Sequence, residues 1–560
     1  MCEEVIKKVT ASVLKYILPD DWSEEKKEAN PIAAKKVVEA INDGKNVEII
    51  NAVIDGPLKL KSVNVEGEVT IKNTTIRGPI DWSYAAFKRV LNLENSIFET
   101  DVTFTTVTVE KDIFLDGATF CEKAKFSDIT VMGVFYSQST TFRKDVIFTD
   151  GTFKKRIKFS KSTFEGEANF GSARIGSNAE FTGAVFKQLA SFNRARIEGS
   201  AFFESATFEG EANFVSARIG SVAVFTGAEF KQLASFDRAQ IEESAFFKSA
   251  TFEGEANFVS ARIGSTAVFT GAEFKERASF NRAQIEGYAF FKSATFEGEA
   301  DFVSARIGST AVFNGAEFKE RASFNSAQIE RESHFEGTVF DNDVNFQDTS
   351  LKTVFWGEPN VQFIKKIDLR GCIYERFQPI SFWEQLMEHL DPYDRQPFTQ
   401  LEETFRRAGK DKLADDVYYE RKCQESAQKT IRKLSALLLD RFLFRFTGYG
   451  VRLYRLLWAI VPILLIGTII FHLEGAVTPE QLPSMMSSQV TLPWWEAFWV
   501  SLNTFLPIEI PSGADWKPSS QIIPMLGIKF TTFATFLDLA GWILVPVGVA
   551  GIAGLLKRSK

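Results

Sequence analysis

Apolar residues repeat along the chain with a period of 11 between residues 49 and 351. Steps of alternately five and six residues, begun at Ile49, land on apolar side chains, and Ser137 is the one polar residue in the series. Neither the 3.6-residue repeat of an α-helix nor the two-residue repeat of a strand produces this period. A fixed period of this length predicts a repeat architecture, because a phenylalanine-rich globular core would not keep its phase over so many residues.

A small residue stands two positions before each large one through most of this region. Ala212 precedes Phe214 and Ala217 precedes Ile219, so small and large side chains alternate toward one interior. This pattern resembles the pentapeptide-repeat family, which folds as a right-handed, four-sided β-helix with both residues of each pair pointing inward. The resemblance implies such a β-solenoid for residues 48–376. The extra residue on alternate sides implies about 22 residues per coil, and about fourteen coils make a rod of roughly 65 Å.

The centre of the repeat region contains four near-identical 44-residue copies, which begin at Ala168, Ala212, Ala256 and Ala300. Some pentapeptide-repeat proteins mimic DNA with an acidic rod. The copy at residues 212–255 has six acidic and four basic residues, which is too balanced for a strong mimic. The outward positions show no grouping of His, Cys and carboxylates of the kind that catalysis uses.

Whole-chain composition narrows the functional classes. A net charge of −7 over 560 residues argues against nucleic-acid binding by bulk positive charge. The four cysteines are scattered without metal-ligand spacing, which is typical of free thiols in a reducing compartment. Glu3 and Glu4 precede no apolar segment, so the N-terminus does not have the pattern of a signal peptide.

Helical segments are expected on both sides of the solenoid. Residues 1–47 are expected to form a helical cap, with a helix from Asn30-Pro31 to Gly44; a partner-binding helix is the alternative. After an irregular last coil, residues 377–452 should be a helical linker. A capping box at residues 399–402 would open its first helix, which Gly409 would close, and a second helix would run over residues 411–446.

The linker has two interpretations that the sequence leaves open: it is either a rigid spacer or a device that transmits movement. Thr447-Gly-Tyr-Gly450 resembles a potassium-channel filter by its letters, but it lies before the first apolar segment among arginines. We therefore expect it to be a helix break and elbow.

Residues 453–560 have the composition of a membrane domain. The segments 456–473 and 530–556 are each long and apolar enough to cross a bilayer, and tryptophans gather in or beside them. Basic residues precede the first span and follow the second, so the positive-inside rule predicts that the N-terminus, the solenoid and the C-terminus are cytoplasmic. The expected location is the plasma membrane, as a multi-pass protein in contact with lipid.

The stretch between the two spans suggests a function. Residues 493–506 form an apolar helix too short to cross, which suits a re-entrant segment. The layout resembles the two-transmembrane pore module of potassium-channel-like proteins, and Asn503-Thr504 lies at the end of the short helix. The family's Thr-Val-Gly-Tyr-Gly filter is absent, and Pro507-Ile-Glu509-Ile-Pro511 stands in its place. The resemblance implies a homo-oligomer, with a tetramer favoured by analogy.

Several residues are candidates for the pore. Glu509, held between Pro507 and Pro511, would form a carboxylate ring that favours cations, or it is an exposed acidic turn. Asp538 is either a carboxylate at the pore mouth or an interfacial residue. A small-residue surface would pack the second span around an axis or on the first span; its glycines are Gly541, Gly548, Gly551 and Gly554.

We therefore expect an oligomeric, cation-conducting channel with a large cytoplasmic β-solenoid. The alternative is a membrane-anchored scaffold whose solenoid binds a protein partner and which has no pore. An enzyme is not expected, because the three histidines are not grouped and no nucleophile or phosphate-loop motif is present. We expect no cofactor, no bound metal centre and no nucleic-acid partner; a monovalent or divalent cation is the expected permeant ion.

Overall fold

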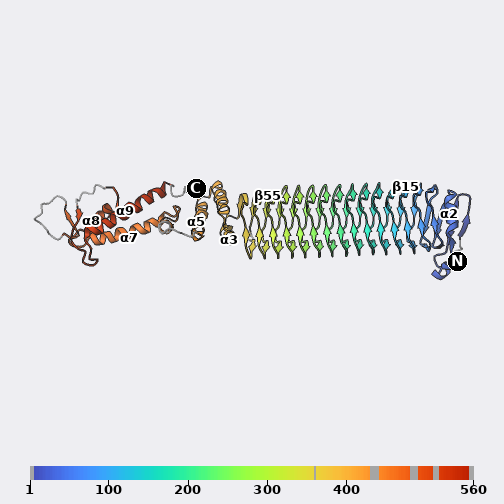
Figure 1. Cartoon of the computed structure of the whole chain (residues 1–560), viewed down its shortest axis with the longest axis horizontal. Helices are drawn as coiled ribbons and strands as arrows, with labels where there is room; N and C mark the ends of the chain where they lie inside the picture. The colour runs from blue at the N-terminus through green and yellow to red at the C-terminus, as the bar shows by residue number, and fades with distance from the viewer. Residues whose placement is uncertain (1–5, 358–360, 429–439, 480–489, 509–515, 554–560) are drawn as a thin grey trace. The chain divides into compact units, whose positions relative to one another are not determined.

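The computed structural model describes residues 6–357, 361–428, 440–479, 490–508 and 516–553 (Figure 1). The chain divides into two compact units, Met1–Pro397 and Phe398–Lys560. The first contains the stacked strands and the second contains most of the helices, including the two apolar ones.

Four ladders of parallel strands build the first unit, and we number them in the order in which the chain visits them. Paired residues lie 22 positions apart, as Ile80 and Val102 do, so one coil has the predicted 22 residues. Ladder 1 runs from β6 (Leu58–Lys59) to β60 (Ile367–Asp368). Ladder 4 holds 16 strands, from β3 (Ile32–Ala33) to β59 (Gln362–Phe363), which gives about 16 coils where the sequence predicted fourteen.

Ladders 2 and 3 belong to one 30-stranded sheet. Ladder 2 passes through β7 (Asn64–Val65) and β15 (Thr108–Val109), and ladder 3 through β8 (Val69–Lys72). They join at β55 (Gln328–His334), which pairs with the last strands of both ladders. Four ladders around one interior confirm the four-sided β-solenoid; its right-handed sense stays a prediction.

The interior consists of stacked rings with alanines between them, as predicted. Ala212 and Phe214 have exposed fractions of 0% and 2%. The rings of Phe214 and Phe236 stack with centroids 4.9 Å apart and an interplanar angle of 1°, while Phe203 meets Phe214 edge-on at 5.3 Å. Each ring therefore contacts the same side of the next coil and a ring from the opposite side of the solenoid, which fixes the register of the stack.

Ser137, the exception in the apolar series, is compensated by its neighbour. Ser137 is fully buried, but the residue two positions before it is Phe135 instead of a small one, and Phe135 is buried as well. The ring of Phe135 packs edge-on against Phe126 and Phe148, filling the space that Ser137 leaves. Small and large have exchanged places in this coil, so the interior keeps its volume.

The N-terminal cap is a mixture of strands and helices, which corrects the prediction of a purely helical one. β1 (Ile6–Val9) and β2 (Val13–Ile17) form a hairpin, and β2 continues ladder 3 by pairing with β4 (Asn46–Ile50). A short helix, α1 (Glu24–Glu28), follows, and α2 (Ala34–Asn42) buries part of its apolar face against the first coil.

Helix α2 begins at Ala34, after the predicted start at Asn30-Pro31. Ile32 and Ala33 instead pair with Ile54 and Asp55, because the first coil offers an open ladder edge that extended residues can satisfy.

The C-terminal end of the solenoid is also covered. The irregular end that the sequence indicated consists of a coil with β58 (Ser350–Phe355), β59 and β60, followed by β61 (Ile373–Gln378), which pairs with β58 and begins the next coil. A 3₁₀ turn, η1 (Ile380–Phe382), and α3 (Trp383–Glu388) follow it. Phe382 is buried with its ring 6.3 Å from that of Trp356 in the last coil, so this segment closes an end that would otherwise expose aromatic rings.

A helical hairpin opens the second unit. Its first helix is α4 (Arg395–Arg407), and the Asp394 carboxylate accepts the Gln396 N–H at 2.7 Å at the start of this helix. The predicted start, a capping box at residues 399–402, is wrong because these residues lie inside the helix. Gly409, at φ +69°, closes the helix as predicted. The second helix, α5 (Asp411–Gln428), starts where predicted; residues 429–439 lie outside the described ones.

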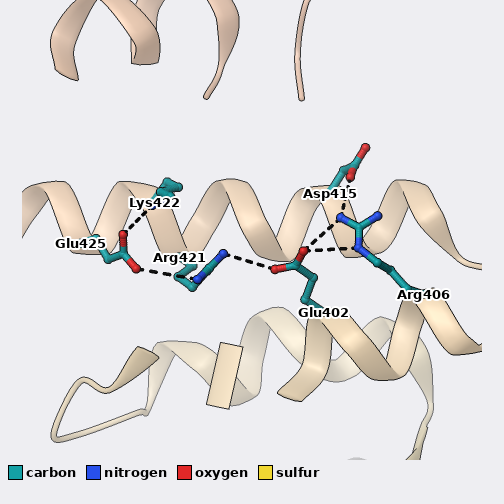
Figure 2. Close-up of polar contacts among 6 residues, drawn as sticks. All are labelled: Glu402, Arg406, Asp415, Arg421, Lys422 and Glu425. Atoms are coloured by element: carbon teal, nitrogen blue, oxygen red, sulfur yellow. Dashed lines mark hydrogen bonds and ion pairs between the residues drawn. The ribbon is translucent and has the colours of Figure 1, made fainter. Parts of the chain in front are cut away.

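Charged side chains hold this hairpin together (Figure 2). Arg421, only 4% exposed, lies 3.4 Å from a Glu402 oxygen, and the other Glu402 oxygen lies 3.0 Å from Arg406. Arg406 also reaches Asp415 at 3.1 Å. Glu402 on α4 is thus the nearer of two carboxylates that neutralise the buried Arg421 of α5; an oxygen of Glu425 lies 3.9 Å from the other terminal nitrogen of Arg421.

Three apolar helices make up the rest of the second unit. They are α7 (Tyr454–Phe471), α8 (Trp494–Phe505) and α9 (Phe530–Ile552). Two short strands, β62 (Val477–Pro479) and β63 (Trp516–Pro518), pair antiparallel and tie together the segments that follow α7 and precede α9.

Candidate functional site

Helix α8 packs against both α7 and α9. The contact is formed by buried apolar residues from all three helices, among them Leu456, Phe471, Ala497, Phe505 and Leu537. The three helices therefore form one core, and α8 lies against both longer helices.

The contacts of α8 define how far it runs along its neighbours. At its start, His472 at the end of α7 donates from Nδ1 to the Leu492 carbonyl at 2.6 Å, and its ring stacks on Trp494 at 3.9 Å. About two turns later, the Ser501 hydroxyl donates to the Leu464 carbonyl of α7 at 3.1 Å. Helix α8 thus runs antiparallel to α7, back from its C-terminal end.

Helix α8 ends level with the middle of α9. A Cβ atom added to Gly541 would lie 1.5 Å from the Phe505 carbonyl oxygen, so the two backbones touch there. Gly541 lies eleven residues after Phe530, the first residue of α9, or about 16 Å along its axis at 1.5 Å per residue. The chain then returns, because Trp516 pairs with Pro479 just beyond the end of α7.

The described glycines of α9 face the other helices of the same chain. A Cβ on Gly548 would meet Leu456 at 3.0 Å, and one on Gly551 would meet Leu453 at 2.2 Å. Leu456 belongs to α7 and Leu453 directly precedes it. These glycines were expected to pack α9 either around an axis or on the first span, and the contacts of Gly548 and Gly551 are with the first span. Gly554 lies outside the described residues.

The candidate pore residues fall partly within the described chain. Asn503 and Thr504 lie in the last turn of α8 and are partly exposed, and the Thr504 hydroxyl donates to the Val500 carbonyl at 2.7 Å. Pro507 follows the helix and is partly exposed too. Glu509 and Pro511 lie outside the described residues.

Asp538 lies in α9, one turn before Gly541, and is partly exposed. It is eight residues from the start of the helix, about 12 Å along the axis. It therefore lies well inside the helix and not at its end, near the level of the last turn of α8.

Three residues that position α8 were not among the predicted candidates. Ser501 is fully buried, and a Cβ on Gly467 of α7 would lie 2.1 Å from its hydroxyl oxygen. His472 holds the start of α8, as described above. The signal in the sequence was a polar or small residue inside an apolar segment, which in a membrane helix indicates a packing contact.

The elbow before α7 joins it to the linker helix α5. A π-helical turn, η2 (Leu443–Thr447), ends at Gly448, Tyr449 and Gly450, which all have positive φ, so this segment is the predicted break. Arg452 reaches Asp416 of α5 at 3.3 Å, and its guanidinium lies 3.9 Å over the Tyr419 ring. Burial raises the pKa of the Tyr419 hydroxyl, which keeps it protonated in this contact.

The outer surfaces of α7 and α9 are apolar and exposed in the isolated chain. Trp458 is 79% exposed and Leu457 is 61% exposed on α7, and Ile552 is 82% exposed on α9. Both helices are long and apolar enough to cross a membrane. In the most apolar 18-residue stretch of each helix, only 28% of α7 and 22% of α9 is buried, so other parts of the chain cover these helices less than they would cover the core helices of a soluble protein.

Comparison with known proteins identifies the repeats. The family model described as "Pentapeptide repeats (9 copies)" matches residues 138–196, 181–229, 192–240, 236–284, 280–328 and 302–350. These stretches lie within the solenoid, which therefore consists of pentapeptide repeats, and together they cover less than half of the chain. No curated protein and no solved structure matches the chain.

Proposed function

We propose that the chain is a subunit of an oligomeric, cation-conducting membrane channel whose second unit forms the pore and whose pentapeptide-repeat solenoid is cytoplasmic. The observation that carries the proposal is the position of α8. This helix starts beside the end of α7 and ends level with the middle of α9.

The lengths and surfaces of α7 and α9 support membrane insertion. At 18 and 23 residues they are about 27 and 35 Å long, against roughly 30 Å for the hydrocarbon layer. Their exposed tryptophan, leucine and isoleucine side chains would be costly in water and are solvated by lipid.

The depth of α8 supports a pore. If α7 and α9 span the membrane, the chain leaves α8 near the bilayer centre and returns to the side from which it came. Non-helical backbone at that depth is tolerated only where protein buries it or a water-filled path satisfies it. Leu506, Pro507 and Ile508, the described residues that follow α8, are in that position.

A single copy of three helices encloses no path, so conduction requires several copies around an axis. Each copy would contribute one Glu509, and a ring of carboxylates attracts cations and repels anions. Partly exposed Asn503 and Asp538, at nearby levels of the module, would add polar groups along the same path.

Purified protein in liposomes tests the channel directly. We expect cation flux through the parent protein, lower conductance or relaxed selectivity for Glu509→Gln, and no cation flux for Glu509→Lys. Glu474→Lys is the matched control, because Glu474 is an exposed acid after α7 and away from the end of α8. Absence of flux in the parent, or parent-like flux in Glu509→Lys, contradicts the proposal.

The same module defines a topology that can be tested separately. By the positive-inside rule, the basic residues around the two spans support a solenoid and a C-terminus inside the cell. In a background without exposed native cysteines, Ser512→Cys should react with an impermeant thiol reagent added to intact cells, and Ser559→Cys should not. The opposite pattern reverses the orientation.

Insertion without flux would leave the second candidate, a membrane-anchored scaffold. In that function α7 and α9 are anchors, and the solenoid, which is long, rigid and closed at both ends, presents its faces to a protein partner.

A further inference from the structure

Ladder 3 carries a row of outward apolar side chains on six consecutive coils. The strands are β32 (Ala201–Phe202), β36 (Ala223–Val224), β40 (Ala245–Phe246), β44 (Ala267–Val268), β48 (Ala289–Phe290) and β52 (Ala311–Val312). In each strand the alanine is buried and the second residue is partly exposed, so the second residue points outward. We call these six residues the Phe/Val row: Phe202, Val224, Phe246, Val268, Phe290 and Val312.

The other three ladders are polar at the same outward positions over these coils. Ladder 1 carries serine, asparagine and aspartate, ladder 2 arginine and glutamine, and ladder 4 threonine and glutamate. The row is bounded along ladder 3 by Glu180 and His334. One face of the rod therefore has a continuous apolar strip, and the equivalent outward residues on the other ladders, and on the coils before and after the strip, are polar.

The sizes in the row alternate without exception. Phenylalanine and valine take turns from one coil to the next, and the row has six members, beginning with Phe202 and ending with Val312. Read in reverse, the row places a valine where the forward reading has a phenylalanine. Two copies laid face to face in opposite directions would therefore set each large side chain against a small one.

We infer that the Phe/Val row is the contact between the solenoids of two copies of this chain, packed face to face and antiparallel. The two-fold axis lies between Phe246 and Val268 and runs along the strands. It brings Phe246 opposite Val268, Val224 opposite Phe290, and Phe202 opposite Val312. The contact is isologous, because the same patch serves both copies.

The residues that flank the row are compatible with this arrangement. The residue two positions after each member of the row lies beside it. At these positions the axis sets Lys248 opposite Thr270 and Glu204 opposite Asn314, so no like charges meet there. Two positions before it, Val222 faces Tyr288, which is 44% exposed and stacks on Phe290. A tyrosine that extends the apolar strip thus meets a valine that extends it on the partner.

A parallel arrangement of the same faces fits less well. With the two-fold axis along the rod, each phenylalanine would meet its own copy and each valine its own copy. Three crowded levels would alternate with three gaps, and both overpacking and voids cost stability.

The antiparallel pair has a consequence for the whole protein that does not depend on the pore proposal. Reversal places the C-terminal ends of the two solenoids at opposite ends of the pair. Gln378 lies five and a half coils beyond the axis, so the two ends are about 53 Å apart at ~4.8 Å per coil. Each pair would then link two second units that are held apart, and these would join separate pores or separate anchors.

Site-specific cross-linking tests the pairing in the purified full-length chain. Cys2, Cys121 and Cys423 are replaced by serine; Cys372 is kept, because it is buried and burial raises the pKa of its thiol to about 12. Phe202→Cys and Val312→Cys chains are then treated with a short bis-maleimide, separately and mixed. In the antiparallel pair Phe202 of one copy faces Val312 of the other, whereas the two Phe202 positions lie five coils, about 24 Å at ~4.8 Å per coil, apart. We expect a covalent dimer in the mixture and not in either variant alone.

The other outcomes overturn the inference. A dimer formed by Phe202→Cys alone indicates the parallel arrangement, and no dimer in any sample indicates that the row does not pair. The cross-link reports only on the solenoid, and ion flux in liposomes reports only on the second unit. The two experiments together therefore distinguish a channel whose solenoids do not pair from paired solenoids without a channel.

A charge variant gives an independent check. Phe246→Lys is added to both cysteine variants, Phe202→Cys and Val312→Cys, and should weaken their pairing by about tenfold, the effect of ~1.4 kcal/mol, so the cross-linked fraction falls. Thr251→Lys is the control; it adds the same charge in the same coil on ladder 4, between Glu229 and Glu273, and should leave the cross-linked fraction unchanged. If the two lysine substitutions change the cross-linked fraction equally, the Phe/Val row is not the contact.

Discussion

Phe246 and Phe247 are neighbours in the chain and point to opposite sides of the solenoid wall. Phe246 is partly exposed, whereas Phe247 is fully buried. Phe247 stacks between Phe225 and Phe269, each at 4.9 Å, and meets Phe236 and Phe258 edge-on at 5.2 Å. Replacing each in turn with alanine compares the interior with the surface at one place in the fold.

We expect Phe247→Ala to destabilise its coil by about 3 to 5 kcal/mol, because the cavity lies among rings that cannot close over it. Phe246→Ala should cost about 1 kcal/mol or less in the unpaired chain, since it loses only partly exposed area. A solenoid opens locally, so the readout is amide hydrogen exchange measured peptide by peptide across the coils around residue 247.

The expected difference is large enough to be decisive. A loss of 3 to 5 kcal/mol speeds exchange through local opening by roughly 100- to 4,000-fold, and the effect should decline in coils farther from the substitution. Phe246→Ala should leave the same peptides protected within about fivefold, measured at a low protein concentration. Equal exchange in the two variants would refute the assignment of inward and outward faces.

Two further pairs of variants test the second unit. Gly541→Ala should lower the thermal stability of the helical unit by about 1 to 3 kcal/mol, because its Cβ would lie 1.5 Å from a backbone oxygen; Gly548→Ala, which meets only a movable leucine methyl at 3.0 Å, should be tolerated. Equal melting temperatures in detergent would argue against the contact between α8 and α9. Glu402→Ala should cost about 3 kcal/mol, because buried Arg421 then keeps only Glu425, whose oxygen lies 3.9 Å away. Glu403→Ala, in an exposed pair with Arg407, should cost at most about 1 kcal/mol. Hydrogen exchange in α4 and α5 that does not distinguish these two would contradict the role of Glu402.

The sequence alone determined the solenoid because its physics is local and repeated. An inward position recurs every five or six residues, and the partner of each residue is the equivalent residue one coil later, as with Ile80 and Val102. The small-large pairs, such as Ala212 with Phe214, then specify four sides and a stacked interior without any long-range information. The two span-length helices were predictable for a similar reason, since apolar composition over 18 or more residues depends on no neighbour.

The tertiary structure decided where one element meets another. Ile32 and Ala33 extend a ladder because an open edge lies beside them, although the local signals at Asn30 and Pro31 favour a helix start. Phe135 points inward because Ser137 leaves room for its ring. The position of α8 between α7 and α9 depends on three contacts, with His472, Leu464 and Gly541, that lie far apart in the chain. Periodicity determines which face of an element is buried. A contact between distant segments depends on which backbone groups still need a hydrogen-bond partner and which spaces remain to be filled when the segments meet.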